Sequence, residues 1–347
     1  MRVEVQTETL ESVAARLLKG RVTSVEPLGG GRNSQVYRVI DAGRRAYALK
    51  VYFRHPADDR DRLGTEFDGL KFLWRHGLRN IPEPLAADAA AGCALYEYVE
   101  GVAITPAEIS GDDIQLAVSF LSRLKELSTE PESPDLPLAS EACFSGEALL
   151  HNLQWRLDRL LQQQPGQPAD PALRAFLLEE FAPAFDAITR WSSSQFALQE
   201  ELPWARRTLS PSDFGFHNAL RRANGEPVFL DFEYFGWDDP AKTLSDFLLH
   251  PAMELSESLR RQFARELLRR FADDASLAER AKGVYPLFGL KWCLILLNEF
   301  LPEHWLRRRF AAAADSPQQA LQAGQLSKAR AMLQRISREY EHFPYFE

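Results

Sequence analysis

The fold is decided by two stretches, LSPSDFGFHN at residues 209–218 and VFLD at residues 228–231. The first has the composition of a loop and carries an acid, Asp213, and an amide, Asn218, five positions apart. The second is a short apolar strand that ends on another acid, Asp231. Mg²⁺ prefers a few hard oxygen ligands, so Asn218 and Asp231 suffice as protein donors while Asp213 stays free to accept a proton. Taken singly each is more often a turn residue, and the combination carries the prediction.

A glycine-rich connection lies far upstream, between two predicted strands at residues 22–27 and 35–41. Its residues Gly30, Gly31 and Ser34 can expose backbone N–H groups to an anion, because glycine places no Cβ in the way. A phosphate group could therefore rest on this hairpin. A simple tight turn is the alternative interpretation.

Two charged residues follow this hairpin and are predicted to face inward. Lys50 lies in an alternating strand, where it shares a face with apolar Ala48. Glu66 lies on the next helix, in line with Leu70 and Leu73 at i+4 and i+7. A buried lysine and a buried carboxylate each need a partner of opposite charge. Two exposed charges on long side chains are the alternative.

The order of these features is that of a protein-kinase-like enzyme: glycine-rich hairpin, strand lysine, helix glutamate, Asp-x4-Asn loop and strand-end aspartate. Residues 209–218 are similar to the His-Gly-Asp-x4-Asn loop of the aminoglycoside phosphotransferase and choline kinase superfamily. FLDFEY at residues 229–234 resembles the Ile-Asp-Phe/Trp-Glu segment of that superfamily. The resemblance covers nearly the whole chain.

The resemblance implies an α+β, two-lobed protein-kinase-like fold. The spacing of β-formers and breakers in the first hundred residues also predicts a five-stranded antiparallel sheet with helices, and helical periodicity dominates after Gly101. We therefore expect residues 1–101 to form an N-terminal nucleotide-binding lobe and hinge. Residues 102–347 are expected to form a mostly helical C-terminal lobe with the catalytic loop and the acceptor site.

The resemblance also implies roles for individual residues, with ATP and Mg²⁺ as cofactors. Asp213 would accept the proton of the substrate hydroxyl, while Asn218 and Asp231 would hold Mg²⁺. Gly30, Gly31 and Ser34 would lie over the nucleotide phosphates. Lys50 would contact the α- and β-phosphates and pair with Glu66. Glu97 and Val99 would belong to the hinge whose backbone meets adenine. Asp246 would brace the catalytic loop.

The sequence departs from the superfamily pattern at several positions. Pro211 and Ser212 stand where the superfamily has His and Gly before the catalytic Asp, so another group must orient Asp213. In the hairpin, the order Arg-Asn-Ser-Gln-Val leaves open whether Asn33 or Ser34 faces phosphate.

Composition limits the class of partner and the compartment. Hydrophobic residues make up 45% and charged residues 26% of the chain, and the net charge is −8. This negative charge disfavours nucleic acid and anionic membranes as partners. Three isolated cysteines and an N-terminus without a signal-like apolar run favour a cytoplasmic protein. The oligomeric state is not predicted.

The leading hypothesis is an ATP- and Mg²⁺-dependent phosphotransferase that acts on a hydroxyl of a small molecule resembling an aminoglycoside, an amino alcohol or a sugar. Glu233, Asp238 and Asp239 could bind an amine on such a substrate, although a solvated acidic loop is an equal alternative. Trp292 could contact a cation, whereas Lys291 would suit an anionic sugar. A choline- or ethanolamine-type kinase is the runner-up among enzymes. A pseudokinase, which would bind nucleotide or act as a scaffold without turnover, is the alternative from another class.

Overall fold

The computed structural model describes residues 9–30, 33–55, 58, 60–162, 170–311 and 318–345. The chain divides into two compact units. Unit 1 comprises Met1–Ile104, Asn218–Phe235 and Leu306–Asp315, and unit 2 comprises Thr105–His217, Gly236–Trp305 and Ser316–Glu347. The chain passes from unit 2 to unit 1 after His217, inside the stretch that decides the fold.

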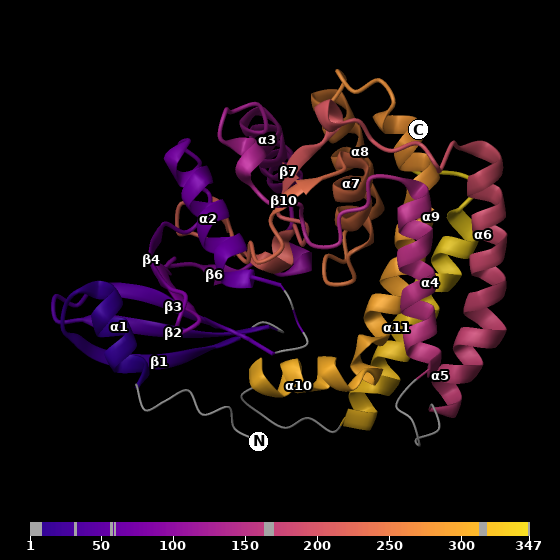
Figure 1. Cartoon of the computed structure of the whole chain (residues 1–347). Helices are drawn as coiled ribbons and strands as arrows, with labels where there is room; N and C mark the ends of the chain where they lie inside the picture. Colours follow the sequence, from indigo (N-terminus) through magenta and orange to yellow (C-terminus); the bar gives the residue numbers. More distant parts are fainter. Residues whose placement is uncertain are drawn as a thin grey trace. The chain divides into compact units, whose positions relative to one another are not determined.

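Unit 1 is built on a five-stranded sheet in the order β1-β2-β3-β5-β4 (Figure 1). All neighbouring strands are antiparallel, which confirms the predicted sheet and the α+β class. The strands are β1 (Val22–Gly30), β2 (Ser34–Asp41), β3 (Ala46–Tyr52), β4 (Pro84–Asp88) and β5 (Cys93–Glu97).

Helix α1 (Leu10–Leu18) packs on this sheet, and α2 (Arg62–Arg75) contacts β4 and β5. Each helix begins at a polar cap: Thr9 accepts the N–H of Ser12, and Asp61 accepts the N–H of Gly64. The buried residues of the α1 core are Val13, Ala14, Val39, Leu49, Cys93 and Leu95.

Residues 218–235 join unit 1 through a second, small sheet. It contains β6 (Val102–Ala103), β8 (Ala219–Arg221) and β9 (Pro227–Phe229), and β8 and β9 form an antiparallel hairpin whose second strand is the predicted apolar one before Asp231. The chain then runs against α2, where a Cβ on Gly69 would lie 2.5 Å from the ring of Phe235. Glycine at position 69 therefore permits the close approach that brings the segment after Asp231 to the helix of Glu66.

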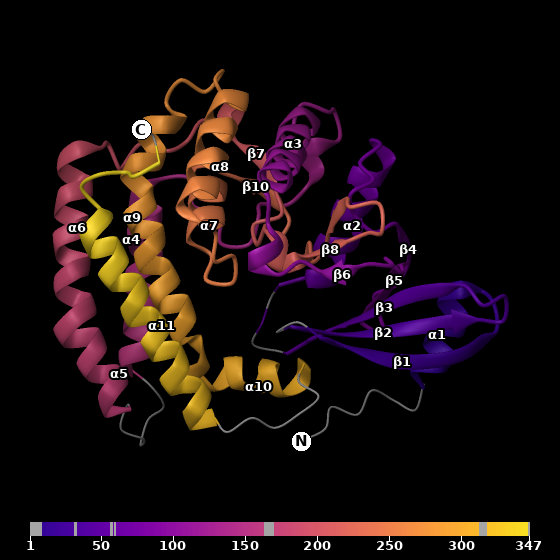
Figure 2. The same cartoon turned by 180° about the vertical axis from the view of Figure 1, so that it is seen from behind.

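Unit 2 is mostly helical, as expected. Helices α4, α6, α9 and α11 lie side by side, and α7 packs against α9 (Figures 1 and 2). The helices are α3 (Gly111–Leu127), α4 (Gly146–Gln162), α5 (Pro171–Ala175), α6 (Ala182–Gln195), α7 (Pro240–Leu249), α8 (Glu257–Arg270), α9 (Leu277–Leu296) and α11 (Gln318–Glu339). Helix α10 (Pro302–Ala311) begins in unit 2 and ends in unit 1.

Two short strands frame the catalytic-loop candidate in unit 2. Strand β7 (Thr208–Ser210) leads into the loop, and antiparallel β10 (Gly236–Asp238) pairs with it and leads into α7. The sequence predicted neither strand, because the two lie far apart in the chain and no turn joins them, unlike β8 and β9.

Candidate active site

Lys50 is the centre of the polar cluster in unit 1. Its side chain is 9% exposed, and its Nζ lies 2.6 Å from Glu66 Oε2 and 2.6 Å from Asp231 Oδ1. Burial alone would lower the pKa of Lys50, but the carboxylates of Asp231 and Glu66 raise it well above its usual value. The protonated amine of Lys50 thus joins strand β3 to helix α2 and to Asp231, which follows β9.

Glu233 adds another carboxylate beside this cluster. Its Oε1 accepts a hydrogen bond from Asn33 Nδ2 (2.5 Å), while its Oε2 is buried without a hydrogen-bond partner among the described residues. Burial and the nearby charge of Asp231 raise the pKa of Glu233 to about 7. The orphaned oxygen and the raised pKa indicate a local excess of negative charge, which fits a divalent cation beside Asp231.

Asp231 and Ser212 share an uncommon backbone conformation. Asp231 has φ 65° and Ser212 has φ 66°, in the left-handed region where non-glycine residues are strained. Position 212 is glycine in the superfamily pattern, and the left-handed conformation supplies the physical reason. Ser212 precedes the proposed proton acceptor Asp213, and Asp231 is itself a proposed metal ligand.

Asp213 in unit 2 lies beside two stacked histidines. Its Oδ1 lies 3.1 Å from His217 Nε2 and 3.4 Å from His250 Nε2. The two imidazole rings are stacked 3.7 Å apart and nearly parallel, at 7°. The three groups are close enough to share a metal ion. However, stacked rings direct their nitrogens side by side rather than toward one point, which suits two hydrogen bonds better than metal coordination.

The partners of the other ring nitrogens assign the protons of this pair. His250 Nδ1 accepts the backbone N–H of Ala252 (3.2 Å), so the proton of a neutral ring lies on Nε2. His217 Nδ1 is buried and has no partner among the described residues, which also places the proton on Nε2, toward Asp213. His217 then donates to Asp213 Oδ1, and His250 Nε2 carries its proton 3.4 Å from the same oxygen, so the two rings favour one orientation of the carboxylate.

A buried lysine of α7, Lys242, anchors the 209–218 loop through Ser212. Lys242 Nζ donates to Ser212 Oγ (2.9 Å) and Asp238 Oδ2 (2.8 Å), and it lies 3.1 Å from Asp246 Oδ2. Asp246 also accepts a hydrogen bond from Trp292 Nε1 (2.9 Å). These contacts join the loop to α7 and α9.

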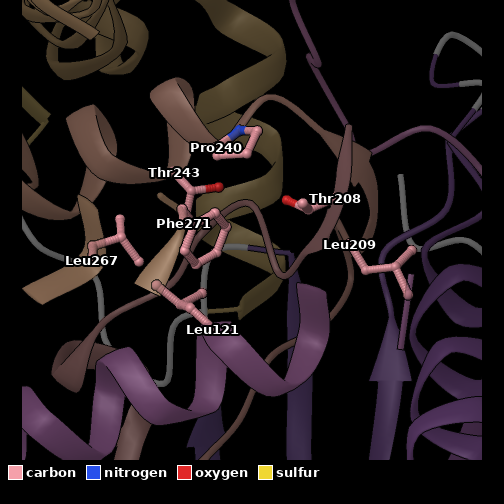
Figure 3. A pocket seen from close by; sticks show the side chains of 7 residues that line it. All are labelled: Leu121, Thr208, Leu209, Pro240, Thr243, Leu267 and Phe271. Carbon is pink, nitrogen blue, oxygen red and sulfur yellow. The ribbon is translucent and has the colours of Figure 1, made fainter. Parts of the chain in front are cut away.

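Packing beneath β7 is close. The small cavity in Figure 3 has a volume of only about 10 Å³ and is lined by Thr208 and Leu209 of β7 and by residues of α3, α7 and α8. Such a volume holds at most one water molecule. This cavity is therefore too small for a substrate. The interior between β7 and helices α3, α7 and α8 is nearly filled.

The structure of unit 2 corrects the prediction that Asp238 and Asp239 either bind an amine of the substrate or belong to a solvated acidic loop. Asp238 is fully buried against Lys242, and Asp239 caps α7 and bonds Arg280 (3.0 Å). Both acids are therefore neutralised within the fold, and neither belongs to a solvated acidic loop. Asp239 and Arg280 line a cavity of about 240 Å³ around the start of α4 and the first half of α9, and Asp213 is absent from that lining.

The remaining predicted site residues lie as follows. Gly30 ends β1, and Gly31 lies outside the described residues. Ser34 is buried at the start of β2, and Asn33 donates to Glu233 and to Tyr234 Oη (2.6 Å).

The hinge candidates and Asn218 also have defined places. Glu97 ends β5, where its carboxylate accepts from Arg222 (2.7 Å), and Val99 is buried two residues later. Asn218 O accepts the N–H of Leu230 (2.7 Å), which fixes Asn218 at the base of the β8–β9 hairpin.

Sequence reasoning missed three groups of polar residues. His217 lies four residues after Asp213, a spacing that could have been noticed, whereas His250 carries no local signal. Tyr52 Oη donates to Glu66 (2.9 Å) from the same strand as Lys50, two residues on. Arg62 lies one helical turn before Glu66, on the same face of α2.

Comparisons with known proteins agree with this arrangement. Residues 24–280 match the sequence model of the phosphotransferase enzyme family. No curated protein sequence matches the chain. No helix in the described part of the chain is both long and apolar enough to cross a membrane.

Several solved structures share the fold. The gentamicin complex of APH(2")-IIa is 17% identical with a TM-score of 0.61, over 95% of this chain and 97% of that chain. Spectinomycin phosphotransferase APH(9)-Ia, in complex with ADP and spectinomycin, is 12% identical with a TM-score of 0.63, over 97% and 99%. Choline kinase LicA from Streptococcus pneumoniae is 16% identical with a TM-score of 0.59, over 94% and 98%.

The family match covers most of the chain and includes the 209–218 loop, Asp231, Lys50 and Glu66. The resemblance to aminoglycoside phosphotransferases and choline kinases is thereby confirmed. The chain belongs to the phosphotransferase enzyme family.

Proposed function

We propose that this chain is an ATP- and Mg²⁺-dependent phosphotransferase that moves the γ-phosphate to a hydroxyl of a small molecule. The observation that carries the proposal is the position of Lys50, held at 2.6 Å from both Glu66 and Asp231. A lysine so fixed presents a permanent positive charge at a defined point, which is what positioning of nucleotide phosphates requires.

On the nucleotide side, Lys50 would contact the α- and β-phosphates, with Glu66 fixing its orientation. The side chain of Asn33 is already engaged with Glu233 and Tyr234, so Ser34 and the backbone of Gly30 and Gly31 are the better candidates to face phosphate. Glu97 and Val99 would provide the backbone groups that meet adenine.

Asn218 and Asp231 would hold Mg²⁺. The side chain of Asp231 is 30% exposed although its Oδ1 bonds Lys50, so it is accessible to a ligand. The unsatisfied carboxylate oxygen of Glu233 supports a cation in this corner. When bound, Mg²⁺ supplies charge neutralisation for the phosphate oxygens.

On the acceptor side, Asp213 would accept the hydroxyl proton. Its side chain is 33% exposed, while His217 and His250 are 12% and 14% exposed. The histidines would replace the orienting function that Pro211 cannot supply, because proline offers no side-chain donor. This support favours a competent enzyme over a pseudokinase.

The acceptor would be an aminoglycoside, an amino alcohol or a sugar-like molecule. Trp292 contacts His250 edge-on, with ring centroids 4.6 Å apart, and thereby brings an aromatic side chain to the Asp213 cluster. An aromatic ring near carboxylates suits a substrate that carries a cationic amine. This observation favours an amino alcohol or an aminoglycoside over an anionic sugar.

A coupled ADP-release screen with Mg²⁺-ATP tests the proposal. The panel contains aminoglycosides, amino alcohols and free sugars, with Asp213→Asn as the blank. Asp186→Asn, a matched change at an exposed position on α6, is the control. We expect acceptor-dependent release by the wild type and the control, at least 10²-fold above the blank.

Two other outcomes are informative. Equal release by wild type and Asp213→Asn would contradict the role of Asp213. Thermal stabilisation by Mg²⁺-ATP without release for any acceptor would favour the pseudokinase alternative.

A further inference from the structure

The turn that leads into Asp213 is strained, and Ser212 is its central residue. The backbone N–H of Asp213 donates to the carbonyl of Pro211 (2.8 Å), two residues earlier, and Ser212 between them has φ 66°. This combination is the rare form of the γ-turn, in which the central residue has a positive φ. A residue with a side chain keeps such a conformation only where its surroundings fix it. The contacts that hold Ser212 therefore also hold the backbone of Asp213.

The hydroxyl of Ser212 bridges a donor and an acceptor. Its Oγ accepts a hydrogen bond from Lys242 Nζ (2.9 Å) and donates one to the backbone carbonyl of Ser140 (3.2 Å). The backbone N–H of Ser212 donates to Ser210 Oγ (3.0 Å). A group that serves a lysine and a carbonyl at once must both accept and donate, as a hydroxyl does. Neither glycine nor alanine could form this bridge.

The donor of the bridge, Lys242, is held independently of Ser212. Its side chain is only 3% exposed and belongs to the first turn of α7. Its Nζ lies 2.8 Å from Asp238 Oδ2 and 3.1 Å from Asp246 Oδ2. These two ion pairs keep the ammonium group in place, so it is a fixed point for the loop.

The acceptor of the bridge, the carbonyl of Ser140, is held from both sides. The preceding residue, Ala139, donates its N–H to a carbonyl of strand β10 (2.9 Å). The carboxylate of the following residue, Glu141, lies 3.1 Å from Lys291 Nζ of α9 and also bonds an arginine of α4. Glu141 has φ 62°, so left-handed residues lie at both ends of the hydrogen bond between Ser212 and Ser140. The hydroxyl thus spans two points that α4, α7, α9 and β10 fix.

We propose that Ser212 is a positioning residue for Asp213, and that it acts through its hydroxyl. A turn that required only a left-handed backbone would be served best by glycine, which adopts a positive φ without strain. Serine is strained there, but it adds two hydrogen bonds that glycine cannot make. His217 orients the carboxylate of Asp213, and the Ser212 bridge holds the backbone that carries this carboxylate. The kinetic consequence of this inference rests on the proposed phosphotransfer, whereas its structural consequence does not.

Replacement of Ser212 by glycine and by alanine separates the hydroxyl from the backbone. Ser212→Gly removes the bridge and relieves the strain, whereas Ser212→Ala removes the bridge and keeps the strain. We expect both to lower kcat of acceptor-dependent ADP release roughly 10- to 100-fold, with KM for ATP and acceptor changed less than about 3-fold. Ser212→Cys, whose thiol is a weak donor and acceptor, should recover part of kcat.

Ser192→Ala is the matched control. Ser192 is another buried serine of unit 2, and its hydroxyl donates to the backbone carbonyl of Gly283 (3.3 Å). The control should alter kcat less than about 2-fold, because it shares no partner with the loop. Urea denaturation shows which variants are folded under the assay conditions. Wild-type kcat in folded Ser212→Gly and Ser212→Ala would overturn the proposal, as would an equal loss of kcat in Ser192→Ala.

Crystal structures of the apo wild type and of Ser212→Gly test the inference without turnover. In the wild type, we expect the Asp213 carboxylate within hydrogen-bond distance of His217 Nε2, at about the 3.1 Å found here. In the variant, it should leave this position or adopt more than one orientation. A single, unchanged orientation in the variant would overturn the positioning role. Movement of the carboxylate, with no ADP release by the wild type for any acceptor, would refute the proposed function and leave the positioning role standing.

Discussion

Each unit of the molecule contains one buried lysine between two carboxylates, and the two clusters differ in their access to solvent. In unit 1, Lys50 is bonded to buried Glu66 and to Asp231, which is 30% exposed. In unit 2, Lys242 is bonded to Asp238 and Asp246, which are 0% and 14% exposed. The two clusters contain the same kinds of side chain, but only the Lys50 cluster has a carboxylate, Asp231, that is substantially exposed to solvent.

The difference separates a ligand site from a structural support. In the Lys242 cluster the third hydrogen bond of the lysine goes to a hydroxyl, Ser212 Oγ, and both carboxylates lie within the fold. The Lys50 cluster has an additional carboxylate, Glu233, with an unsatisfied oxygen. We therefore expect loss of Lys242 to act mainly on stability and loss of Lys50 to act mainly on phosphotransfer.

The largest effect is expected for Lys242→Met. The variant leaves Asp238 buried without a cation, so the free energy of unfolding should fall by about 3–5 kcal/mol. Urea denaturation of wild type and variant measures this. The double variant Lys242→Met/Asp238→Leu should recover part of the loss, because a buried pair can be replaced by apolar groups. A fall in the free energy of unfolding below about 1 kcal/mol would show that solvent reaches the Lys242 cluster.

Lys50→Met should reduce phosphotransfer by about 10²- to 10³-fold, since it removes a fixed charge from the phosphates. Its free energy of unfolding should fall less than that of Lys242→Met. Asp231 is 30% exposed, so its charge costs less without the lysine than the charge of Asp238, which is fully buried. ADP release and urea denaturation measure the two quantities.

The matched control for this comparison is Lys71→Met, an exposed position on α2. It should retain activity and stability. Equal destabilisation by Lys50→Met and Lys242→Met would remove the distinction between the two clusters.

Within unit 2, the histidine pair should affect rate more than stability. His217→Ala removes the donor to Asp213, and His250→Ala removes the ring stacked on His217, so kcat should fall roughly 10- to 100-fold with little change in KM. His217→Gln, whose Nε2 can also donate to Asp213, should restore part of kcat. A change confined to KM, or equal activity of the Ala and Gln variants, would contradict a positioning role.

Much of the fold could be predicted because its signals are local. The alternation around Lys50, the breakers between strands and the helical periodicity after Gly101 each depend on neighbours in sequence. Strands β7 and β10 were missed because each owes its pairing to the other, which is distant in sequence. The assignment of residues 218–235 to unit 1 also depends on tertiary packing, such as that of Phe235 on Gly69.

The residues of the candidate site also fall into two groups, those that the sequence reveals and those that only the fold brings together. Lys50, Glu66, Asp213, Asn218 and Asp231 could be named because their spacing repeats a pattern of the superfamily. His250 could not, because it reaches its cluster only through the path of the folded chain. Its partner, Asp213, is 37 residues away in sequence.

The smallest effect is expected for Asp58 in unit 1, which lies within ion-pair distance of Arg60, Arg62 and Arg307. Burial would raise the pKa of Asp58, but hydrogen bonds from Arg60 and Arg62 offset this and hold it well below its usual value. A carboxylate with a lowered folded-state pKa contributes stability that is present above its unfolded pKa, near about 4, and lost as the pH falls through the folded one. Asp58→Asn should therefore cost about 1–2 kcal/mol at pH 7, and the difference from wild type should shrink below about pH 4. Urea denaturation at several pH values measures this difference, and a difference that stays constant down to pH 3 would show that Asp58 is not paired with the arginines in solution.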